Sequence, residues 1–284
     1  MSGITSFPVE SPLGRWTMTG WSPPHLAGVV ESIWHFDGVM SCLRERTFPS
    51  GLLQLIIHLD ERYRVVEDGR PEVCAEVCVG GIQTGPLVIE SPGSRCRIMG
   101  IQLRPVGAYR LFGLPLAELA GQSNVDLQDV VGAAAAELRD LCLEAGSAEE
   151  QVRRAAAWIE GRISRAPEAD RAIAWTAAQI QQRQGAVSIS LLRDRTGLSK
   201  TRLAAGFRDQ IGVTPKLYAR ILRFRRTLGL INQGEESLAE IALAAGYYDQ
   251  PHMNAELREL SGMAPGEFLA AARYPNSVSL AEPA

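Results

Sequence analysis

Residues 191–215 read LLRDRTGLSKTRLAAGFRDQIGVTP, and residues 240–265 follow the same plan with EIALAAGYYDQPHMNAELRELSGMAP. In each copy an apolar-periodic segment ends at a glycine, a second such segment follows, and a Gly-x-x-Pro motif closes it. Internal repetition of this kind predicts two copies of one supersecondary unit. The punctuating glycines correspond at offsets of 49 and 50 residues: Gly197 with Gly246, and Gly212 with Gly262.

Each copy is predicted to fold as a helix, a tight turn and a second helix. Gly197 and Gly246 suit the left-handed backbone conformation that ends a helix and turns the chain sharply. Ser199 and Asp249 are favoured N-caps for the next helix, because their side-chain oxygens accept from its free amide groups. We expect the second helices over two ranges: 199–210 and 249–260.

Each second helix has one apolar face that can pack on the first helix of its copy. Leu203 and Phe207 supply this face in one copy, and Met253 and Leu257 supply it in the other. The opposite face is left free to enter a major groove. Two hairpins of a helical scaffold are the alternative, but the matched punctuation and the long basic helix expected from Pro215 to Ile231 favour helix-turn-helix units.

The residues quoted above resemble the AraC-type DNA-binding domain, over a span from Glu168 to Tyr274. The most specific block is Ser237-Leu-Ala-Glu-Ile-Ala, then Gly246-Tyr-x-Asp-Gln and Gly262-Met-x-Pro265-x-x-Phe268. The resemblance implies two recognition helices in successive major grooves of double-stranded DNA, held apart by the long helix. It further implies a transcription regulator, an activator by the habit of the family, with RNA polymerase as a partner.

The family pattern assigns base-facing positions on both recognition helices: Thr201, Ala204, Ala205, Gln250, Pro251, Asn254 and Ala255. Gln250 and Asn254 could each read an adenine edge through two hydrogen bonds, a contact worth about 1–3 kcal/mol of discrimination. The two alanines of the first helix depart from the longer polar side chains expected there. They offer apolar contact only, so we expect this helix to read weakly or through DNA shape.

Basic residues of the first recognition helix are expected to meet phosphates rather than bases: Lys200, Arg202 and Arg208. The chain has a net charge of −3, yet the part from Gly185 to Pro275 holds 12 basic and 9 acidic residues, including both lysines. Arginines of the linking helix (Arg220, Arg223, Arg225, Arg226) could join this basic surface or form an ordinary solvated face.

The length of 284 residues suggests two domains. We expect a sensing or regulatory domain at 1–164, a DNA-binding domain at 165–275 and a flexible tail at 276–284. No apolar run is long enough to span a bilayer and no secretory signal is evident, which makes a cytoplasmic protein the default. Five scattered cysteines fit reduced thiols.

The N-terminal part predicts strands and then helices, which gives an α+β fold class. Short strands separated by turn residues indicate a mainly-β, cupin-like barrel over 16–105, with strands at 51–59, 63–67, 73–79, 87–90 and 97–103. Composition then changes, and helices are expected within 106–164, at 106–111, 127–144 and 148–163. The segment from Arg104 to Leu119 resembles an uncharacterised group of cupin-like domains that precede AraC-type domains.

Trp34, His35 and Phe36 could line a ligand cavity in this barrel, and a small-molecule effector is a candidate partner. Cys74 and Cys78, at even spacing on one expected strand, and the histidines do not converge in a metal motif, so we expect no cofactor, no metal and no catalytic residue. Two alternatives stay open: a cupin-like metal enzyme with a helical accessory domain, and a helix-turn-helix interaction protein without specific DNA readout. The sequence leaves monomer and homodimer equally open.

Overall fold

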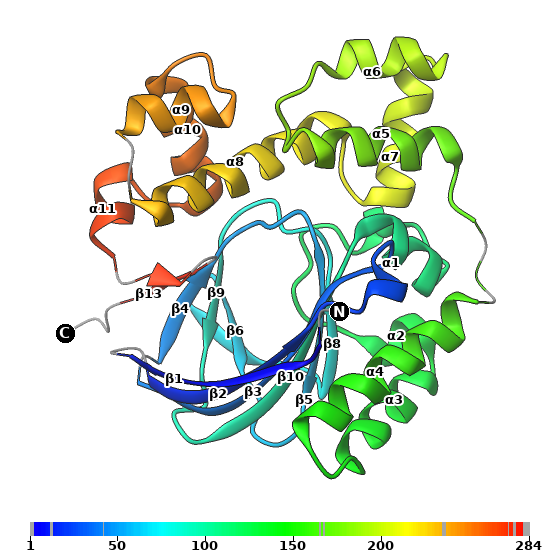
Figure 1. The fold of residues 1–284 in the computed structure, drawn as a ribbon, viewed down its shortest axis with the longest axis vertical. Coiled ribbons are helices and arrows are strands. Elements are labelled where there is room, and N and C mark those ends of the chain that lie inside the picture. Colours follow the sequence, from blue (N-terminus) through cyan, green and yellow to red (C-terminus); the bar gives the residue numbers. More distant parts are fainter. Residues whose placement is uncertain are drawn as a thin grey trace.

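The computed structural model describes residues 3–11, 14–41, 43–164, 166, 168–234, 237–271, 273–274 and 277–280. Two antiparallel sheets form the lower part of the molecule in Figure 1, and the helices from Arg171 onward lie above them. The predicted α+β fold class, with a β-rich first part and two helix-turn-helix units, is confirmed. Arg165 and Pro167, at the expected domain boundary, lie outside the described residues.

The larger sheet has seven strands in the order β1-β2-β3-β10-β5-β8-β11, and every neighbouring pair is antiparallel. Its strands are β1 Thr5–Ser11, β2 Gly14–Trp21, β3 Val30–Met40, β5 Leu53–His58, β8 Val77–Gly80, β10 Cys96–Leu103 and β11 Val125–Asp126. The sheet begins earlier than the expected position 16. Pro8 is tolerated in β1 because this strand lies at the edge of the sheet.

The smaller sheet faces the larger one and has the order β12-β13-β4-β9-β6-β7. Its strands are β4 Arg44–Thr47, β6 Arg64–Glu67, β7 Arg70–Val73, β9 Leu87–Glu90, β12 Arg273–Tyr274 and β13 Ser277–Leu280. The strand β13 pairs with β4, so the expectation of a flexible tail over 276–284 is wrong for residues 277–280. Residues 276 and 281–284 lie outside the described part of the chain.

The single strand expected over 73–79 is two strands that belong to different sheets. The strand β7 ends at Val73 and β8 begins at Val77, and the chain crosses between the sheets in the intervening residues. The Cys74 amide donates to the Tyr63 carbonyl and the Ala75 amide donates to Asn124 Oδ1, so this crossing has hydrogen bonds of its own. The alternation of apolar residues did not reveal the break, although the two strands differ in burial: β7 is exposed throughout and β8 is buried throughout.

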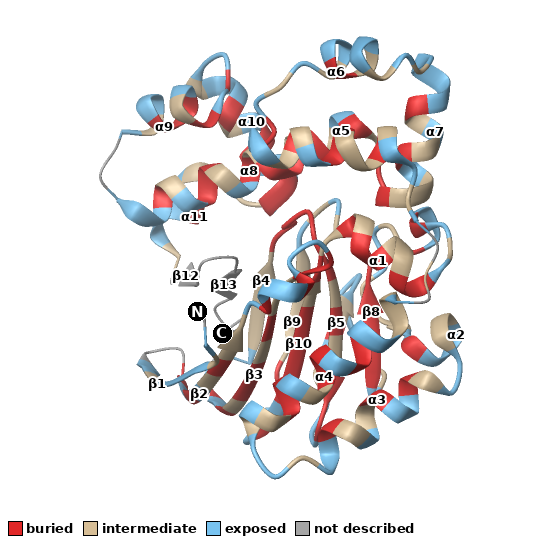
Figure 2. Cartoon of the chain, turned by 45° about the vertical axis from the view of Figure 1, so that its right-hand side comes forward, coloured by how far each residue is buried: buried red, intermediate tan, exposed pale blue. Residues whose placement is uncertain are grey.

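Each strand of the larger sheet presents its alternate residues to two different environments. One face, which carries Ile33, Leu55 and Ile101, is fully buried. The helices α3 (Ala134–Leu143) and α4 (Ala148–Ile163) pack over the outer side of this sheet, as Figure 2 shows. The other face looks toward the smaller sheet.

Helices follow the sheets where the sequence predicts them, with one correction. The helix α1 spans Pro105–Phe112 and α4 spans Ala148–Ile163, as expected. The single helix expected over 127–144 is broken into α2 (Leu127–Val131) and α3, because Gly132 adopts φ 64° and ψ −143°, a conformation that ends α2. Two short 3-10 turns complete this part: η1 Pro24–Leu26 and η2 Leu116–Glu118.

The C-terminal helices follow the predicted repeat closely. They are α5 Arg171–Gln182, α6 Ile189–Thr196, α7 Lys200–Ile211, α8 Pro215–Gln233, α9 Leu238–Ala245, α10 Gln250–Ser261 and α11 Pro265–Ala270. Gly197 and Gly246 end the first helix of each copy in the left-handed region, at φ 68° and 88°. Ser199 Oγ accepts from the Arg202 amide and Asp249 Oδ1 accepts from the His252 amide, so both predicted N-caps are confirmed.

A buried carboxylate fixes the linking helix α8 against α10. Glu256 of α10 is 5% exposed, and its Oε1 accepts from Arg220 Nε at 2.8 Å and from Arg223 Nη2 at 2.7 Å. Arg220 also pairs with the more exposed Glu259, and the Arg223 guanidinium stacks over the Tyr247 ring at 4.7 Å. These contacts hold the second helix-turn-helix unit at one angle to α8.

The helical part rests on the sheets through an aromatic cluster. Phe48, which follows β4 and is 4% exposed, contacts Phe224 of α8 edge-on at 6.2 Å between ring centroids and Phe268 of α11 at 5.6 Å. Gly51, three residues further on, lies so close to Leu222 that a Cβ there would approach its Cδ2 to 2.8 Å. The loop between β4 and β5 is therefore packed tightly against α8.

Two polar contacts flank this cluster. Glu31 at the start of β3 pairs with Arg104 at 2.5 Å and with Arg225 of α8 at 3.6 Å. Arg46 Nη1 donates to the Gly262 carbonyl at 3.3 Å, at the end of α10. The first helix-turn-helix unit is also seated, because α7 packs on α1 and η2.

Replacing Phe48 by alanine is expected to lower the free energy of unfolding by about 3–5 kcal/mol, since it empties a buried ring site shared by three elements. Urea denaturation followed by circular dichroism measures the loss. Phe7→Ala is the matched control, because Phe7 is 50% exposed and its loss should cost no more than about 0.5 kcal/mol. Equal losses in the two variants would show that the Phe48 cluster does not hold the helical part.

Replacing Glu256 by glutamine is expected to destabilise the chain by about 3 kcal/mol, because two guanidinium groups lose their shared buried carboxylate. Glu259→Gln removes an exposed partner of Arg220 and should cost less than about 1 kcal/mol. Thermal unfolding of both variants and the parent chain separates the two cases. A loss at Glu256 no larger than at Glu259 would contradict the assigned role.

Candidate DNA interface and ligand cavity

The base-facing positions expected on α7 lie on the side of the helix away from its buried face. Leu203, Phe207 and Ile211 are buried. Thr201 and Ala205 are exposed, one turn apart, and Ala204 is half-buried beside them. The exposed set expected to meet phosphates is on the same helix: Lys200, Arg202 and Arg208. The docking of α7 on α1 and η2 leaves these side chains accessible.

The corresponding positions of α10 follow the same division. Met253, Leu257 and Leu260 are fully buried. Pro251 and Ala255 are exposed, and Gln250 is half-exposed at the first turn of the helix. Pro251 stands at the second helical position, where no intrahelical partner is needed for a backbone N–H. These three expected base-facing positions therefore combine one polar side chain with two small apolar ones.

Asn254 needs a rearrangement before it can read a base. It is half-buried, and its Oδ1 is shielded from solvent without a hydrogen-bond partner within the described residues. Reading an adenine takes both the oxygen and the nitrogen of the amide. A change of side-chain rotamer would present both atoms, so Gln250 is the better placed of the two amides.

The turn before α10 contains two adjacent tyrosines that differ in burial. Tyr247 is buried at 5% exposure, packs edge-on against His252 at 5.2 Å and lies under Arg223. Tyr248 is 88% exposed. Two adjacent tyrosines in a turn gave no sequence signal for this difference, which depends on the packing of Arg223. Tyr248 thus joins the exposed surface around α10.

The arginines of the linking helix do not form one free basic surface. Arg220 and Arg223 are engaged by Glu256, and Arg225 lies 3.6 Å from Glu31. These three arginines form neither a basic surface for DNA nor an ordinary solvated face, because each is paired with a carboxylate of the same chain. Accessible positive charge near the helix-turn-helix units comes instead from exposed side chains of several helices, among them those of α7, Lys216 of α8 and Arg258 of α10.

A cavity of about 550 Å³ lies between the two sheets. Trp34 and Phe36 of β3 both line it, together with Trp16 and Met18 of β2, whereas His35 is not among the lining residues. The opposite wall includes Thr47 of β4, Leu87 of β9 and the Phe48 ring. The cavity is therefore closed on one side by the segment that touches α8 and α11.

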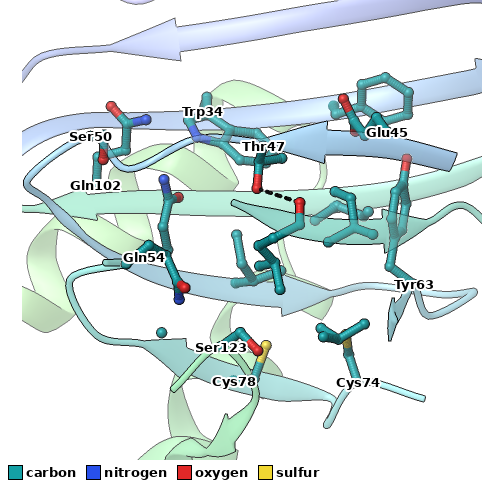
Figure 3. Close-up of a pocket in the computed structure, with 18 of the residues that line it drawn as sticks. Trp34, Glu45, Thr47, Ser50, Gln54, Tyr63, Cys74, Cys78, Gln102 and Ser123 are labelled. Carbon is teal, nitrogen blue, oxygen red and sulfur yellow. Dashed lines mark hydrogen bonds between the residues drawn. The ribbon is translucent and has the colours of Figure 1, made fainter. Parts of the chain in front are cut away.

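Polar side chains lie at both ends of the cavity. Figure 3 shows Ser50, Gln54 and Gln102 together on one side, with Tyr63 and Glu45 at the other. Gln54 of β5 pairs in register with Gln102 of β10, which makes them direct cross-strand neighbours. Most of the remaining lining is apolar or aromatic.

Burial and hydrogen bonds shift the pKa values of three groups in the cavity wall. Burial lowers the pKa of His58, whose Nδ1 lies 3.0 Å from the Ala75 carbonyl oxygen. A hydrogen bond between the Cys74 and Cys78 thiols lowers the pKa of Cys74 and, with burial, raises that of Cys78. Although they stand on different segments, both cysteines face the cavity. Cys42 lies outside the described residues.

Two features are absent from the described part of the chain. No group of three or more His, Cys, Asp or Glu side chains there is arranged to hold a metal ion. No helix there is both long and apolar enough to cross a membrane.

Two family models match separate parts of the sequence. Residues 192–271 match the family described as "Helix-turn-helix domain", which covers α7 to α11 and most of α6. Residues 22–124 match a "Domain of unknown function (DUF6597)", which covers most of the two sheets and α1. No curated protein matches the sequence significantly.

Several solved structures are similar in arrangement at low sequence identity. ToxT from Vibrio cholerae is 12% identical over 84% of this chain and 97% of that chain, with a TM-score of 0.47. A second ToxT structure, bound to (E)-4-(8-methylnaphthalen-1-yl)but-3-enoic acid, is 13% identical over 84% and 98%, with a TM-score of 0.46. The AraC-like transcriptional activator CuxR is 15% identical over 82% and 86%, with a TM-score of 0.30.

The matched helices are the ones that carry the repeat motifs, and they have the caps and turns that those motifs predict. A pair of helix-turn-helix units of this type is a DNA-binding element of transcription regulators. The chain thus combines a domain of the DUF6597 family with a helix-turn-helix DNA-binding domain of the AraC type.

Proposed function

We propose that the chain is a sequence-specific transcription regulator whose helices α7 and α10 enter successive major grooves, and whose DNA binding is controlled through the cavity between its sheets. The observation that carries the proposal is the matched exposure of two capped recognition helices. Each buries one apolar face and leaves the opposite face accessible. By the habit of the resembling family, we propose an activator that works with RNA polymerase.

The residues proposed for base contact are Thr201, Ala204, Ala205, Gln250, Pro251, Asn254 and Ala255. Lys200, Arg202 and Arg208 are proposed to meet phosphates, because they are exposed cations on the first recognition helix. The small side chains on α7 favour shape readout there, so α10 is expected to supply most of the direct discrimination.

Control through the cavity is supported by the contacts of its wall. Phe48 lines the cavity and packs on both α8 and α11. Ser50, also in the lining, is next to Gly51, which abuts Leu222 of α8. A ligand that moves this loop would change the packing of the linking helix, because close-packed interiors do not absorb such shifts locally.

The test is selection of bound sequences from a pool of randomised duplexes at two salt concentrations. Enrichment of one bipartite motif, with half-sites about one helical turn apart, is the expected result. Binding without enrichment would leave only non-specific DNA affinity. No binding at either salt concentration would overturn the proposal.

Gln250→Ala is expected to relax preference at one base position of the selected site, with a loss of discrimination of about 1–3 kcal/mol there. Competition binding with single-base variants of the site measures this loss. Asn254→Ala provides the comparison and should relax a different position. Unchanged base preference in both variants would remove α10 from direct readout.

Arg202→Ala is expected to weaken binding to all duplexes about equally and to reduce the salt dependence of log K by about one. Fluorescence anisotropy with the selected site and an unrelated duplex, over a salt series, gives both quantities. Arg70→Ala is the control, because Arg70 is exposed on β7, an edge strand of the smaller sheet. A selective loss at the preferred site would instead make Arg202 a base-reading residue.

A further inference from the structure

The described lining of the cavity lacks the cationic side chains that a site for a ligand carboxylate would be expected to have. Among the described residues that line it, none is lysine or arginine. His58 is the one basic side chain in this lining, and burial favours its neutral form. A ligand carboxylate would therefore lose its water without gaining a cationic partner, which is costly in an apolar interior.

The cavity's single carboxylate also argues against an anion. Glu45 of β4 stands at the opposite end from the two glutamines (Figure 3). It already takes part in an interaction of its own, so it is not a free counter-ion for a ligand cation. Its negative potential adds to the penalty for an acid. The remaining polar groups are neutral amides, hydroxyls, thiols and two indoles.

A row of neutral residues crosses the larger sheet at the end of the cavity that holds the two glutamines. Ser32, Gln102, Gln54 and Gly80 follow one another in register on β3, β10, β5 and β8. Ser32 Oγ donates to Gln102 Oε1 at 3.0 Å, which leaves the Gln102 Nε2 as a donor toward the cavity. The Gln54 carboxamide makes no hydrogen bond to other described residues. It offers one donor and one acceptor function.

The neighbouring row supplies a flat aromatic surface beside these amides. Trp34 of β3 is in register with Gly100 of β10, and a Cβ at position 100 would lie 2.1 Å from Trp34 Cζ2. The missing side chain therefore lets the indole lie across the sheet. With Phe36 and Trp16 further along β3 and β2, the wall presents stacking surfaces beside the amides.

From this arrangement we infer that the cavity binds an uncharged, largely aromatic ligand that carries an amide-like group, with Gln54 and Gln102 as the residues that recognise this group. The amide of the ligand donates to the Gln54 oxygen and accepts from the nitrogen of Gln54 or Gln102. Its rings lie against Trp34, Phe36 and Trp16. The inference rests on the proposed function in one respect, since it names the class of effector for the controlling site.

The test uses three probes with one skeleton and three charges: biphenyl-4-acetamide, biphenyl-4-acetate and 2-(biphenyl-4-yl)ethylamine. Isothermal titration calorimetry of the full chain near neutral pH gives the three dissociation constants. The amide is expected to bind at least about 10-fold more tightly than the acetate and the amine, because only the amide leaves no unpaired charge in the cavity.

Two substitutions identify the residues responsible. Gln54→Leu keeps the size of the side chain and should weaken amide binding by about 10-fold, whereas Gln128→Leu should change nothing because Gln128 is exposed on α2. Gln54→Lys should reverse the preference and favour the acetate, since it introduces the missing cation. A thermal melt of each variant confirms that it is folded, and the parent chain alone decides the charge preference.

Each outcome bears on the inference. Preference for the amide with loss in Gln54→Leu supports it. Equal or tighter binding of the acetate, tighter binding of the amine, an amide affinity insensitive to Gln54, or no binding of any probe at millimolar concentration would overturn it. DNA binding of the same protein to the selected duplex is measured in parallel. A chain that binds DNA but fails the probe test loses the ligand class alone, and one that fails the DNA test loses the proposed function.

Discussion

The ring of Phe48 joins the parts of this molecule that a regulator has to connect. It closes one side of the cavity between the sheets and packs at the same time on the linking helix α8 and on α11. The ion pairs of Glu256 then tie α8 to α10, so a rigid chain of contacts runs from the cavity to the second recognition helix. Such a chain gives a proposed effector a physical route to DNA binding, since both of its links are buried.

Much of the helical part could be predicted because its signals are local. Glycines that end helices and side chains that cap them act within a few residues, and Gly197, Gly246, Ser199 and Asp249 behave as expected. The even spacing of Trp34 and Phe36 likewise places both on one face of β3, but that this face borders a cavity is visible only in the structure. Their roles, like those of the recognition-helix residues, stay proposals.

The remaining features depend on partners distant in sequence. The strand β4 reads Arg-Glu-Arg-Thr and carries no apolar pattern, yet Arg44 is held by Glu90 of β9 at 2.8 Å. The division of 73–79 between two sheets follows from hydrogen bonds to Tyr63 and Asn124. The arginines of α8 looked like a free basic face because the sequence does not show Glu256 and Glu31 opposite them. The polar row around Gln54 is likewise visible only once β5, β8 and β10 are placed in register.

The pairing of β13 with β4 affects whether the N-terminal and C-terminal parts can be prepared as separate fragments. The last described residues of the chain complete the smaller sheet, and without them β4 would be its open edge. A fragment that ends before the helices would expose the amide and carbonyl groups of that edge, a common template for self-association. The separated C-terminal fragment would carry a strand without its sheet. The two halves of this chain are therefore better studied joined.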